Sequence, residues 1–362
     1  MRILFIANHL NVGGITSYLL TLTSGLKEKG YDIYLASSGG EWADKFSVLG
    51  IKHIYLPLKT KQAVSPNIIF SFFRLKKEIK NLKIDLIHTH SRTTQVLGDL
   101  LSRTLGVVHI FTCHGFFKPK LSRRLFPCWG KGVIAISQEV KEHLINDLKL
   151  DAKKIAVINN GIDVKKFGDA GTRNLVRKNL KIESNDFLVG IIARLSDVKG
   201  HLYLIQAMQK VMQSFSNVKL LIVGQGKMQD FLVREVDSLG IKSNVIFLAK
   251  ADNTQDLLSA MDVFVMPSLQ EGLGLALMEA MAGGLAVVGS AVGGIKTLIQ
   301  DKANGLLVAA TDVSGLVKAI TQLLDNPQMR AELGKNAQKF IIDNFSKTKM
   351  VNQTEEFYKL HG

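Results

Sequence analysis

Two glutamates, Glu271 and Glu279, stand eight residues apart in the run Glu271-Gly-Leu-Gly-Leu-Ala-Leu-Met-Glu279. The pattern predicts Glu271 in a glycine-rich loop and Glu279 little more than one turn into the helix that follows. The free N–H groups at the start of a helix favour anions, so they suit a phosphate. One carboxylate can then accept hydrogen bonds from sugar hydroxyls and the other from ribose hydroxyls. Glu279 could instead be an exposed helix residue, but its neighbours are apolar, and a carboxylate among apolar groups is costly without a partner.

A second pair of charged residues, Arg194 and Lys199, follows the apolar run 187–193, which predicts a strand. Arginine offers a bidentate fork to phosphate oxygens, and lysine offers a mobile point charge. A solvated loop is the alternative interpretation. Open α/β sheets bind ligands at the carboxyl ends of their strands, so the position favours a diphosphate site.

Other expected strand ends carry glycine or histidine. Gly13 and Gly14 follow a strand and precede a helix, where paired glycines let a ligand approach the backbone closely. A tight turn without a ligand fits them equally well. His114 is a candidate at another strand end, although a histidine there is often merely structural. His88 and His90 lack an evident third metal ligand, so we expect them in the site wall or the core.

The alternation of apolar runs and amphipathic stretches predicts two α/β domains, each with a parallel sheet and crossover helices. In the first half the expected strands are 2–7, 31–37, 84–89, 107–112, 132–137 and 155–158. In the second half they are 187–193, 218–223, 245–248, 262–266, 285–289 and 306–308. Residues 159–186 are polar and are interpreted as the linker, and residues 346–360 as a further helix. Because doubly wound sheets bind ligands at strand ends, the gap between the two domains is the expected site.

The composition is that of a packed globular protein, since 46% of its 362 residues are hydrophobic. Cys113 and Cys128 are the only cysteines, too few for a disulfide framework, and a reducing cytosol is the expected compartment. The apolar run at the N-terminus is too short for a signal peptide. The apolar stretch 272–295 contains Glu279 and several glycines, which favours helix, turn and strand over a membrane span.

The formal net charge is +15, and most of the excess lies in the first half. Residues 1–165 hold 24 Lys and Arg against 12 Asp and Glu. A basic half implies an anionic partner: membrane phospholipid, a phosphorylated glycolipid or nucleic acid. No nucleic-acid motif supports the last of these, so we expect no nucleic-acid partner.

Two basic segments of the first half suit an anionic membrane surface. Residues 70–83 predict a helix that has lysines on one face and, on the other, Phe72, Leu75, Ile79 and Leu82. An ordinary helix that covers a sheet gives the same stripe. The segment 116–126 mixes aromatic and basic residues shortly after His114.

The run from Glu271 to Glu279 resembles the E-x7-E motif of the large retaining glycosyltransferase family of GT-B fold, family 4 type. Other motifs agree in order and spacing over nearly the whole chain: Gly13-Gly14-Ile15, Asn160-Gly161-Ile162-Asp163, Arg194 with Lys199, Val223-Gly224-Gln225-Gly226, and Gly293-Gly294. Their joint order is highly specific. The resemblance implies two Rossmann-like domains that face each other across a cleft. The acceptor-binding domain comprises residues 1–163 and a crossing helix, 346–362. The nucleotide-sugar-binding domain comprises residues 164–345.

The resemblance also implies a role for each matched residue. Glu271 contacts the hydroxyls of the transferred sugar, and Glu279 binds ribose. Arg194 and Lys199 stabilise the leaving diphosphate, and His114 orients the sugar or relays a proton. The implied donor-binding residues are Gly13, Gly14, Arg194, Lys199, Gly224, Glu271, Gly272, Leu273, Gly274, Leu275 and Glu279.

Two departures from the family pattern concern the donor. Ala193 stands where the family usually has glycine, and Lys296 and Thr297 stand where it usually has Pro-Glu, which leaves the donor's identity open. The sequence contains no Asp-x-Asp. Arg194, Lys199 and helix starts must then neutralise the leaving group, so we expect no metal and no other cofactor. The resemblance implies retention by front-face attack, assisted by the leaving phosphate.

These observations predict an enzyme that transfers a sugar, with retention and without metal, from a nucleoside-diphosphate sugar to a lipid-linked or cell-surface saccharide. A UDP-sugar is the first candidate donor. The expected location is the cytoplasm, peripherally attached to the inner face of the cell membrane. A sugar-nucleotide epimerase of the same fold and a non-catalytic nucleotide-sugar-binding module are the alternatives. The intact set of Glu271, Glu279, Arg194 and Lys199 argues against the second alternative.

Overall fold

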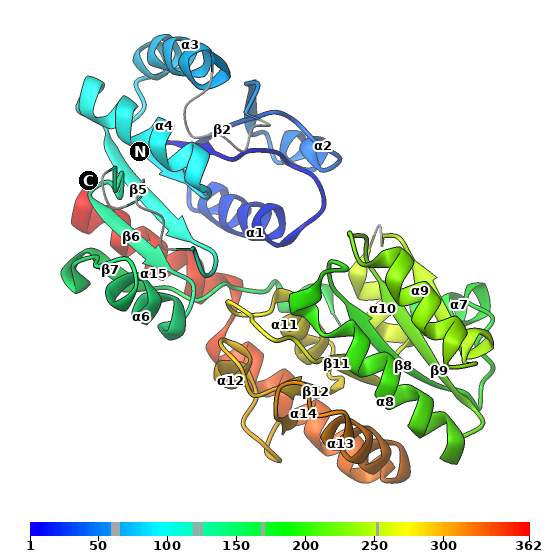
Figure 1. Cartoon of the computed structure of the whole chain (residues 1–362). Coiled ribbons are helices and arrows are strands. Elements are labelled where there is room, and N and C mark those ends of the chain that lie inside the picture. The colour runs from blue at the N-terminus through cyan, green and yellow to red at the C-terminus, as the bar shows by residue number, and fades with distance from the viewer. Residues whose placement is uncertain (59–65, 119–122, 124–125, 168–170, 251–252) are drawn as a thin grey trace. The chain divides into compact units, whose positions relative to one another are not determined.

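The computed structural model describes all residues except 59–65, 119–122, 124–125, 168–170 and 251–252. The chain divides into two compact units (Figure 1). The first comprises Met1–Gly161 and Lys347–Gly362, and the second comprises Ile162–Ser346. The end of the chain therefore belongs to the first unit, although the whole second unit precedes it in the sequence.

A parallel sheet of seven strands forms the centre of the first unit. Its strands are β1 (Arg2–Ile6), β2 (Asp32–Ser37), β3 (Lys52–Tyr55), β4 (Leu86–Thr89), β5 (Val108–Cys113), β6 (Gly132–Ala135) and β7 (Ile155–Val157). They lie in the order β3-β2-β1-β4-β5-β6-β7, so the winding reverses between β1 and β4. Doubly wound sheets bind ligands at the carboxyl ends of their strands, beside such a reversal.

Helices cover both faces of this sheet. They are α1 (Gly14–Glu28), α2 (Ala43–Val48), α3 (Pro66–Leu82), α4 (Arg92–Leu105), α6 (Gln138–Asn146) and α15 (Lys347–His361). Successive residues of β1 point to opposite faces, so Ile3 and Phe5 share one apolar cluster with residues of α1 and α15. Leu4 and Ile6 share the other cluster with residues of α3 and α4. Because both faces are buried, β1 is almost wholly apolar, as is typical of a strand in a parallel sheet.

The second unit repeats this plan around a parallel sheet of six strands. Its strands are β8 (Phe187–Ile192), β9 (Val218–Val223), β10 (Val245–Leu248), β11 (Val263–Met266), β12 (Ala286–Ser290) and β13 (Leu306–Val308). Its helices are α7 (Gly171–Asn179), α8 (His201–Ser214), α9 (Gln229–Ser238), α10 (Thr254–Ala260), α11 (Leu275–Ala282), α12 (Ile295–Leu298), α13 (Val313–Asp325) and α14 (Pro327–Asn344). The order β10-β9-β8-β11-β12-β13 reverses between β8 and β11. The predicted fold class, α/β with two doubly wound parallel sheets, is confirmed.

Two elements differ from the prediction. The sequence pattern missed β3 because this edge strand buries only Ile54. Residues 159–186, predicted to be a polar linker, contain the helix α7. Arg177 of this helix is only 6% exposed. It pairs with Asp262 at 3.4 Å, and Arg173 pairs with the same carboxylate at 2.7 Å. The polar composition of this segment thus reflects ion pairs within the second unit rather than a free linker.

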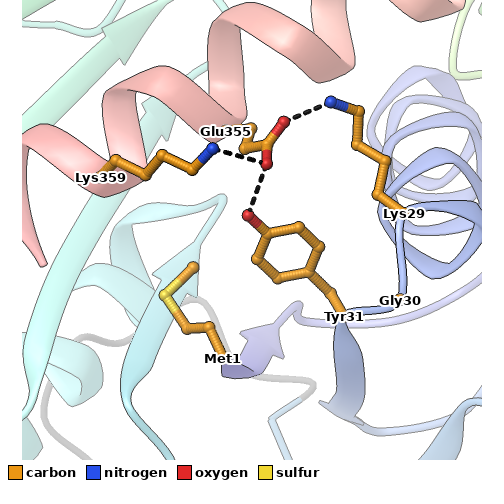
Figure 2. A pocket seen from close by; sticks show the side chains of 6 residues that line it. All are labelled: Met1, Lys29, Gly30, Tyr31, Glu355 and Lys359. Atoms are coloured by element: carbon orange, nitrogen blue, oxygen red, sulfur yellow. Dashed lines mark hydrogen bonds and ion pairs between the residues drawn. The ribbon is translucent and has the colours of Figure 1, made fainter.

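The last helix, α15, is tied to the first unit by polar and close apolar contacts. Glu355 accepts a hydrogen bond from Tyr31 at 2.9 Å and forms ion pairs with Lys359, also at 2.9 Å, and with Lys29 (Figure 2). Figure 2 shows these groups beside a cavity of about 320 Å³ that is lined by Met1, Lys29, Gly30, Tyr31, Glu355 and Lys359. The hydrogen bond from Lys29, followed by those from Lys359 and Tyr31, lowers the pKa of Glu355 to about 2.

We predict that Glu355→Gln weakens the attachment of α15 and changes the response of the protein to acid. The ionised carboxylate stabilises the fold above its unfolded-state pKa of about 4.5, and this contribution is lost as the pH falls toward about 2. Thermal unfolding of the variant should therefore occur at a lower temperature than that of the parent at pH 7. The difference should shrink as the pH approaches 2. Glu356→Gln changes an exposed carboxylate on the same helix and is the matched control; equal effects of the two substitutions would contradict the role of Glu355.

Candidate active site

The loops after β8 and β11 meet at the carboxyl edge of the second sheet. The N–H of Leu269 donates to the carbonyl of Val198 at 2.8 Å. Gly200 has a φ of +71°, and a Cβ atom there would lie 1.9 Å from the carbonyl oxygen of Pro267. Glycine is therefore required at this contact both by the backbone conformation and by the space. The contact brings Lys199 and Glu271, which follow β8 and β11, to the same place.

Lys199 and Glu271 form an ion pair at this edge. Their side chains are only 20% and 13% exposed, so the pair lies in a partly desolvated position. The carbonyl of Glu271 accepts a hydrogen bond from the N–H of Gly294 at 3.1 Å. A Cβ atom at Gly293 would lie 2.1 Å from the same carbonyl oxygen, which explains the second Gly-Gly turn by backbone packing. Lys296, at one of the positions where the family usually has Pro-Glu, lies exposed on α12 just beyond this turn.

Arg194 lies in the same loop as Lys199 but has no partner among the residues that the structure describes. It is exposed and forms no hydrogen bond or ion pair with any described residue. The turn after β9 packs beneath the loop, because a Cβ atom at Gly224 would lie 2.1 Å from the carbonyl oxygen of Ala193. A Cβ atom at Gly226 would likewise lie 2.1 Å from the carbonyl oxygen of Leu195. The loop therefore presents two cationic side chains from a closely packed backbone.

Glu279 lies on α11, which is preceded by Gly274 in the left-handed conformation, with a φ of +91°. Between the two glutamates, Gly272, Leu273 and Gly274 are buried, and Leu275 is partly exposed at the start of the helix. Glu279 itself is partly exposed among apolar neighbours. Desolvation raises its pKa to about 7, and a hydrogen bond with Thr254 opposes this shift. The carboxyl of Glu279 therefore holds its proton to a higher pH than an ordinary glutamate does.

The sequence analysis missed three polar side chains in this region. The hydroxyls of Ser196 and Ser268 and both ring nitrogens of His201 are buried without a hydrogen-bond partner in the described chain. Burial, followed by the charge of Lys199, lowers the pKa of His201 to about 4, so its ring is neutral at pH 7. Ser268 lies two residues after β11, and its position at a strand end was the signal that could have found it.

In the first unit, the predicted His114 belongs to a cluster of histidines. Its Nε2 lies 3.1 Å from Nδ1 of His90. Next to His90, the two ring nitrogens of His88 lie 2.5 Å from the hydroxyl of Tyr358 and 2.7 Å from that of Thr112. His88 and His90 are buried, which agrees with their expected place in the core or site wall. Burial lowers the pKa of all three rings, that of His114 to about 3, so the cluster is neutral at pH 7.

The other predicted residues of the first unit are Gly13 and Gly14, where α1 begins. Both are exposed, and a Cβ atom at Gly13 would meet nothing within 4 Å. Neither crowding within the chain nor a left-handed backbone explains the glycine at position 13. The first unit thus contributes Gly13, Gly14 and His114 to the predicted set, and the second unit contributes all the others.

The arrangement of each unit can be compared with known proteins. Two family models match the chain: "Glycosyltransferase Family 4" over residues 12–166 and "Glycosyl transferases group 1" over residues 172–340. A UDP-Gal:alpha-D-GlcNAc-diphosphoundecaprenol alpha-1,3-galactosyltransferase of Escherichia coli is 30% identical over 304 residues, which cover 80% of this chain and 78% of that protein. The N-acetyl-alpha-D-glucosaminyl L-malate synthase of Bacillus anthracis is 26% identical over 96% of this chain and 94% of its own.

Solved structures share the fold over the full length. HepE of Anabaena, in complex with UDP-glucose, superposes with a TM-score of 0.88 and 23% identity, covering 99% of each chain. WaaG, a glycosyltransferase involved in lipopolysaccharide biosynthesis, gives a TM-score of 0.77 and 17% identity over 98% of this chain and 99% of its own. Two family models match the chain, and one relative is 30% identical to it over most of its length. Together with the shared folds, these matches show that the chain belongs to the group 1 glycosyltransferases and is an enzyme of the GT-B fold.

Proposed function

We propose that this glycosyltransferase takes a sugar from a nucleoside-diphosphate sugar, with a UDP-sugar as the first candidate, and transfers it with retention to a lipid-linked or cell-surface saccharide. The observation that carries the proposal is the ion pair of Lys199 and Glu271 beside the unpaired, exposed Arg194. These three groups offer two cations for a diphosphate and a carboxylate for sugar hydroxyls. Two proteins that resemble this chain have UDP-Gal or UDP-glucose in their descriptions, which supports the choice of donor.

The leaving diphosphate gains negative charge as the glycosidic bond breaks, so groups fixed around it lower the barrier. Arg194 provides a guanidinium fork, and Lys199 provides an ammonium that Glu271 already holds in place. The N–H groups at the start of α11 add a favourable field beside them. These groups are the basis for proposing a reaction that needs no metal ion or other cofactor. Glu271 then has two tasks, because it holds Lys199 in place and also contacts the transferred sugar.

Glu279 is the proposed partner of the ribose hydroxyls. Its position five residues into α11 and its partial exposure leave the carboxyl accessible from the glycine-rich loop. In the first unit, His114 is proposed to orient the transferred sugar. A ring whose pKa is about 3 holds no extra proton at neutral pH, so orientation by a hydrogen bond suits it better than proton donation. The exposed Gly13 and Gly14 are proposed to meet the donor at the start of α1, where a Cβ atom at Gly13 would meet nothing within 4 Å.

We further propose that the acceptor is presented at the cytoplasmic face of the inner membrane, to which the first unit attaches peripherally. The helix α3 supports this through an outward face that the sequence analysis did not predict. Leu75 and Ile79 are buried as expected, but Phe70 and Phe73 are 54% and 64% exposed. Exposed aromatic residues beside exposed basic ones, such as Arg74, suit the boundary between lipid headgroups and acyl chains. No helix in the described ranges has the length and apolar character of a membrane span.

The first prediction concerns the donor. A nucleotide sugar that binds the folded enzyme should raise its melting temperature, and we expect this for at least one UDP- or GDP-sugar without added metal. A thermal-shift panel with and without magnesium measures the effect. A shift that requires magnesium would contradict metal independence, and no shift with any nucleotide sugar would contradict the donor site. Conversion of the sugar without an acceptor would favour an epimerase.

The second prediction concerns Glu271. Glu271→Gln keeps the size of the side chain but removes the charge that holds Lys199 and accepts the sugar hydroxyls. We expect kcat/KM for transfer to fall on the order of a hundredfold or more, with the fold intact by circular dichroism. Glu332→Gln, which changes an exposed carboxylate on α14 of the same unit, should retain full activity. Full activity of Glu271→Gln would overturn the site assignment.

The third prediction follows from the protonation of Glu279. Ribose hydroxyls donate to the ionised carboxylate, so nucleotide binding should lower its pKa from about 7 and release protons. Calorimetric titration of UDP at about pH 6 in buffers of different ionisation enthalpy measures this release. The proton release should disappear in Glu279→Gln. Identical proton release in the two proteins would exclude Glu279 from the nucleotide site.

A further inference from the structure

A guanidinium group with an unused donor lies in the loop that follows β5. The Nη1 atom of Arg123 is buried and has no hydrogen-bond partner among the described residues. The group lies over the ring of Phe117, with its central carbon 4.0 Å from the ring centroid. That ring is fixed in turn, because the N–H of Phe117 donates to Nε2 of His143 at 2.9 Å and the ring stacks on Phe111 at 6.2 Å. A buried N–H without an acceptor costs free energy, so this position is unfavourable as it stands.

A second guanidinium group lies close by. Arg92, the first residue of α4, donates to the carbonyl oxygens of Phe126 at 2.6 Å and Pro127 at 3.1 Å, and to the side-chain oxygen of Gln95 at 3.1 Å. All three acceptors are neutral, so its charge is not compensated by them. Burial, followed by the charge of Arg92, lowers the pKa of Arg123. The two cations therefore repel each other.

No carboxylate in the described part of the chain forms an ion pair with either arginine. Burial lowers the pKa of Arg92 more than the nearby Asp99 raises it, and Asp99 is already paired with Arg103 at 2.8 Å. The pair of guanidinium groups also lies near the predicted site, because the charge of Arg123 reaches the thiol of Cys113, the residue before His114. Two repelling cations with a free buried donor thus stand beside the end of β5.

We propose that Arg123, assisted by Arg92, binds a lipid-borne phosphate group on the acceptor side of the enzyme. This inference rests on the proposed function, since it names the chemistry of the acceptor for the same enzyme. A phosphate oxygen would accept the unused N–H of Arg123 and would neutralise the repulsion between the two guanidinium groups. Arginine matches phosphate geometry through its planar fork of donors. The phosphate belongs either to a diphosphate that links the acceptor sugar to its carrier or to the headgroup of a membrane phospholipid.

The test uses inorganic pyrophosphate as the probe and calorimetric titration of the full chain as the measurement. The Arg194→Gln/Lys199→Gln double variant serves as the background, so that binding at the proposed donor site does not contribute. In this background, Arg123→Gln should weaken pyrophosphate binding roughly tenfold or more, and Arg123→Lys should retain part of it. Arg234→Gln removes the same charge from an exposed position on α9 and should leave pyrophosphate binding unchanged.

A second arm of the test uses sedimentation with phosphatidylglycerol vesicles. Loss of vesicle binding in Arg123→Gln but not in Arg234→Gln would assign the phosphate to a lipid headgroup. Loss of pyrophosphate binding alone would assign it to a diphosphate-linked acceptor. If Arg123→Gln affects neither probe while its melting temperature stays unchanged, the inference is wrong. Because the background already lacks the donor cations, this result is independent of whether the donor assignment holds.

Discussion

Close backbone packing at the carboxyl edge of the second sheet is the constraint on which the charged site depends. At Gly200, Gly224 and Gly293, a Cβ atom would lie between 1.9 and 2.1 Å from a carbonyl oxygen of another loop. Any side chain there would push the loops apart. Because they stay in contact, Lys199 and Glu271, 72 residues apart in the sequence, form an ion pair that is mostly shielded from water. The positions of the charged groups therefore follow from the glycines more than from the charges themselves.

The first unit meets a different constraint, which is the burial of polar rings. His88 and His90 are almost fully buried, and partners for them come from distant parts of the chain. One of these partners is the hydroxyl of Tyr358 on α15, 270 residues from His88. The helix packs so closely that a Cβ atom at Gly25 would lie 2.4 Å from Val351. The last helix is thus a structural part of the first unit, and it completes the hydrogen bonds of a cluster that contains His114.

Cations in this protein fall into two groups. Arg173 and Arg177 share Asp262, and Lys29 pairs with Glu355, so these charges hold elements of one unit together. Arg194 and Arg123, in contrast, follow strands at the carboxyl edges of the two sheets and have no carboxylate partner among the described residues. An unpaired cation contributes little to the stability of the fold, and it remains available to an anionic ligand. The basic side chains that indicate an anionic ligand are therefore those without a carboxylate partner among the described residues.

The sequence by itself determined the two parallel sheets, because alternating apolar runs and amphipathic helices permit few other folds. It also indicated that Arg194, Lys199, Glu271 and Glu279 lie at strand ends or helix starts, since those positions depend on local pattern alone. Only the tertiary structure decided which of them meet, as in the Lys199–Glu271 pair, and which stay unpaired, as Arg194 does. It also decided the edge strand β3, the helix α7 within the supposed linker, and the exposed aromatic residues of α3. These features depend on contacts between residues far apart in the chain, and no local pattern of residue types encodes such contacts.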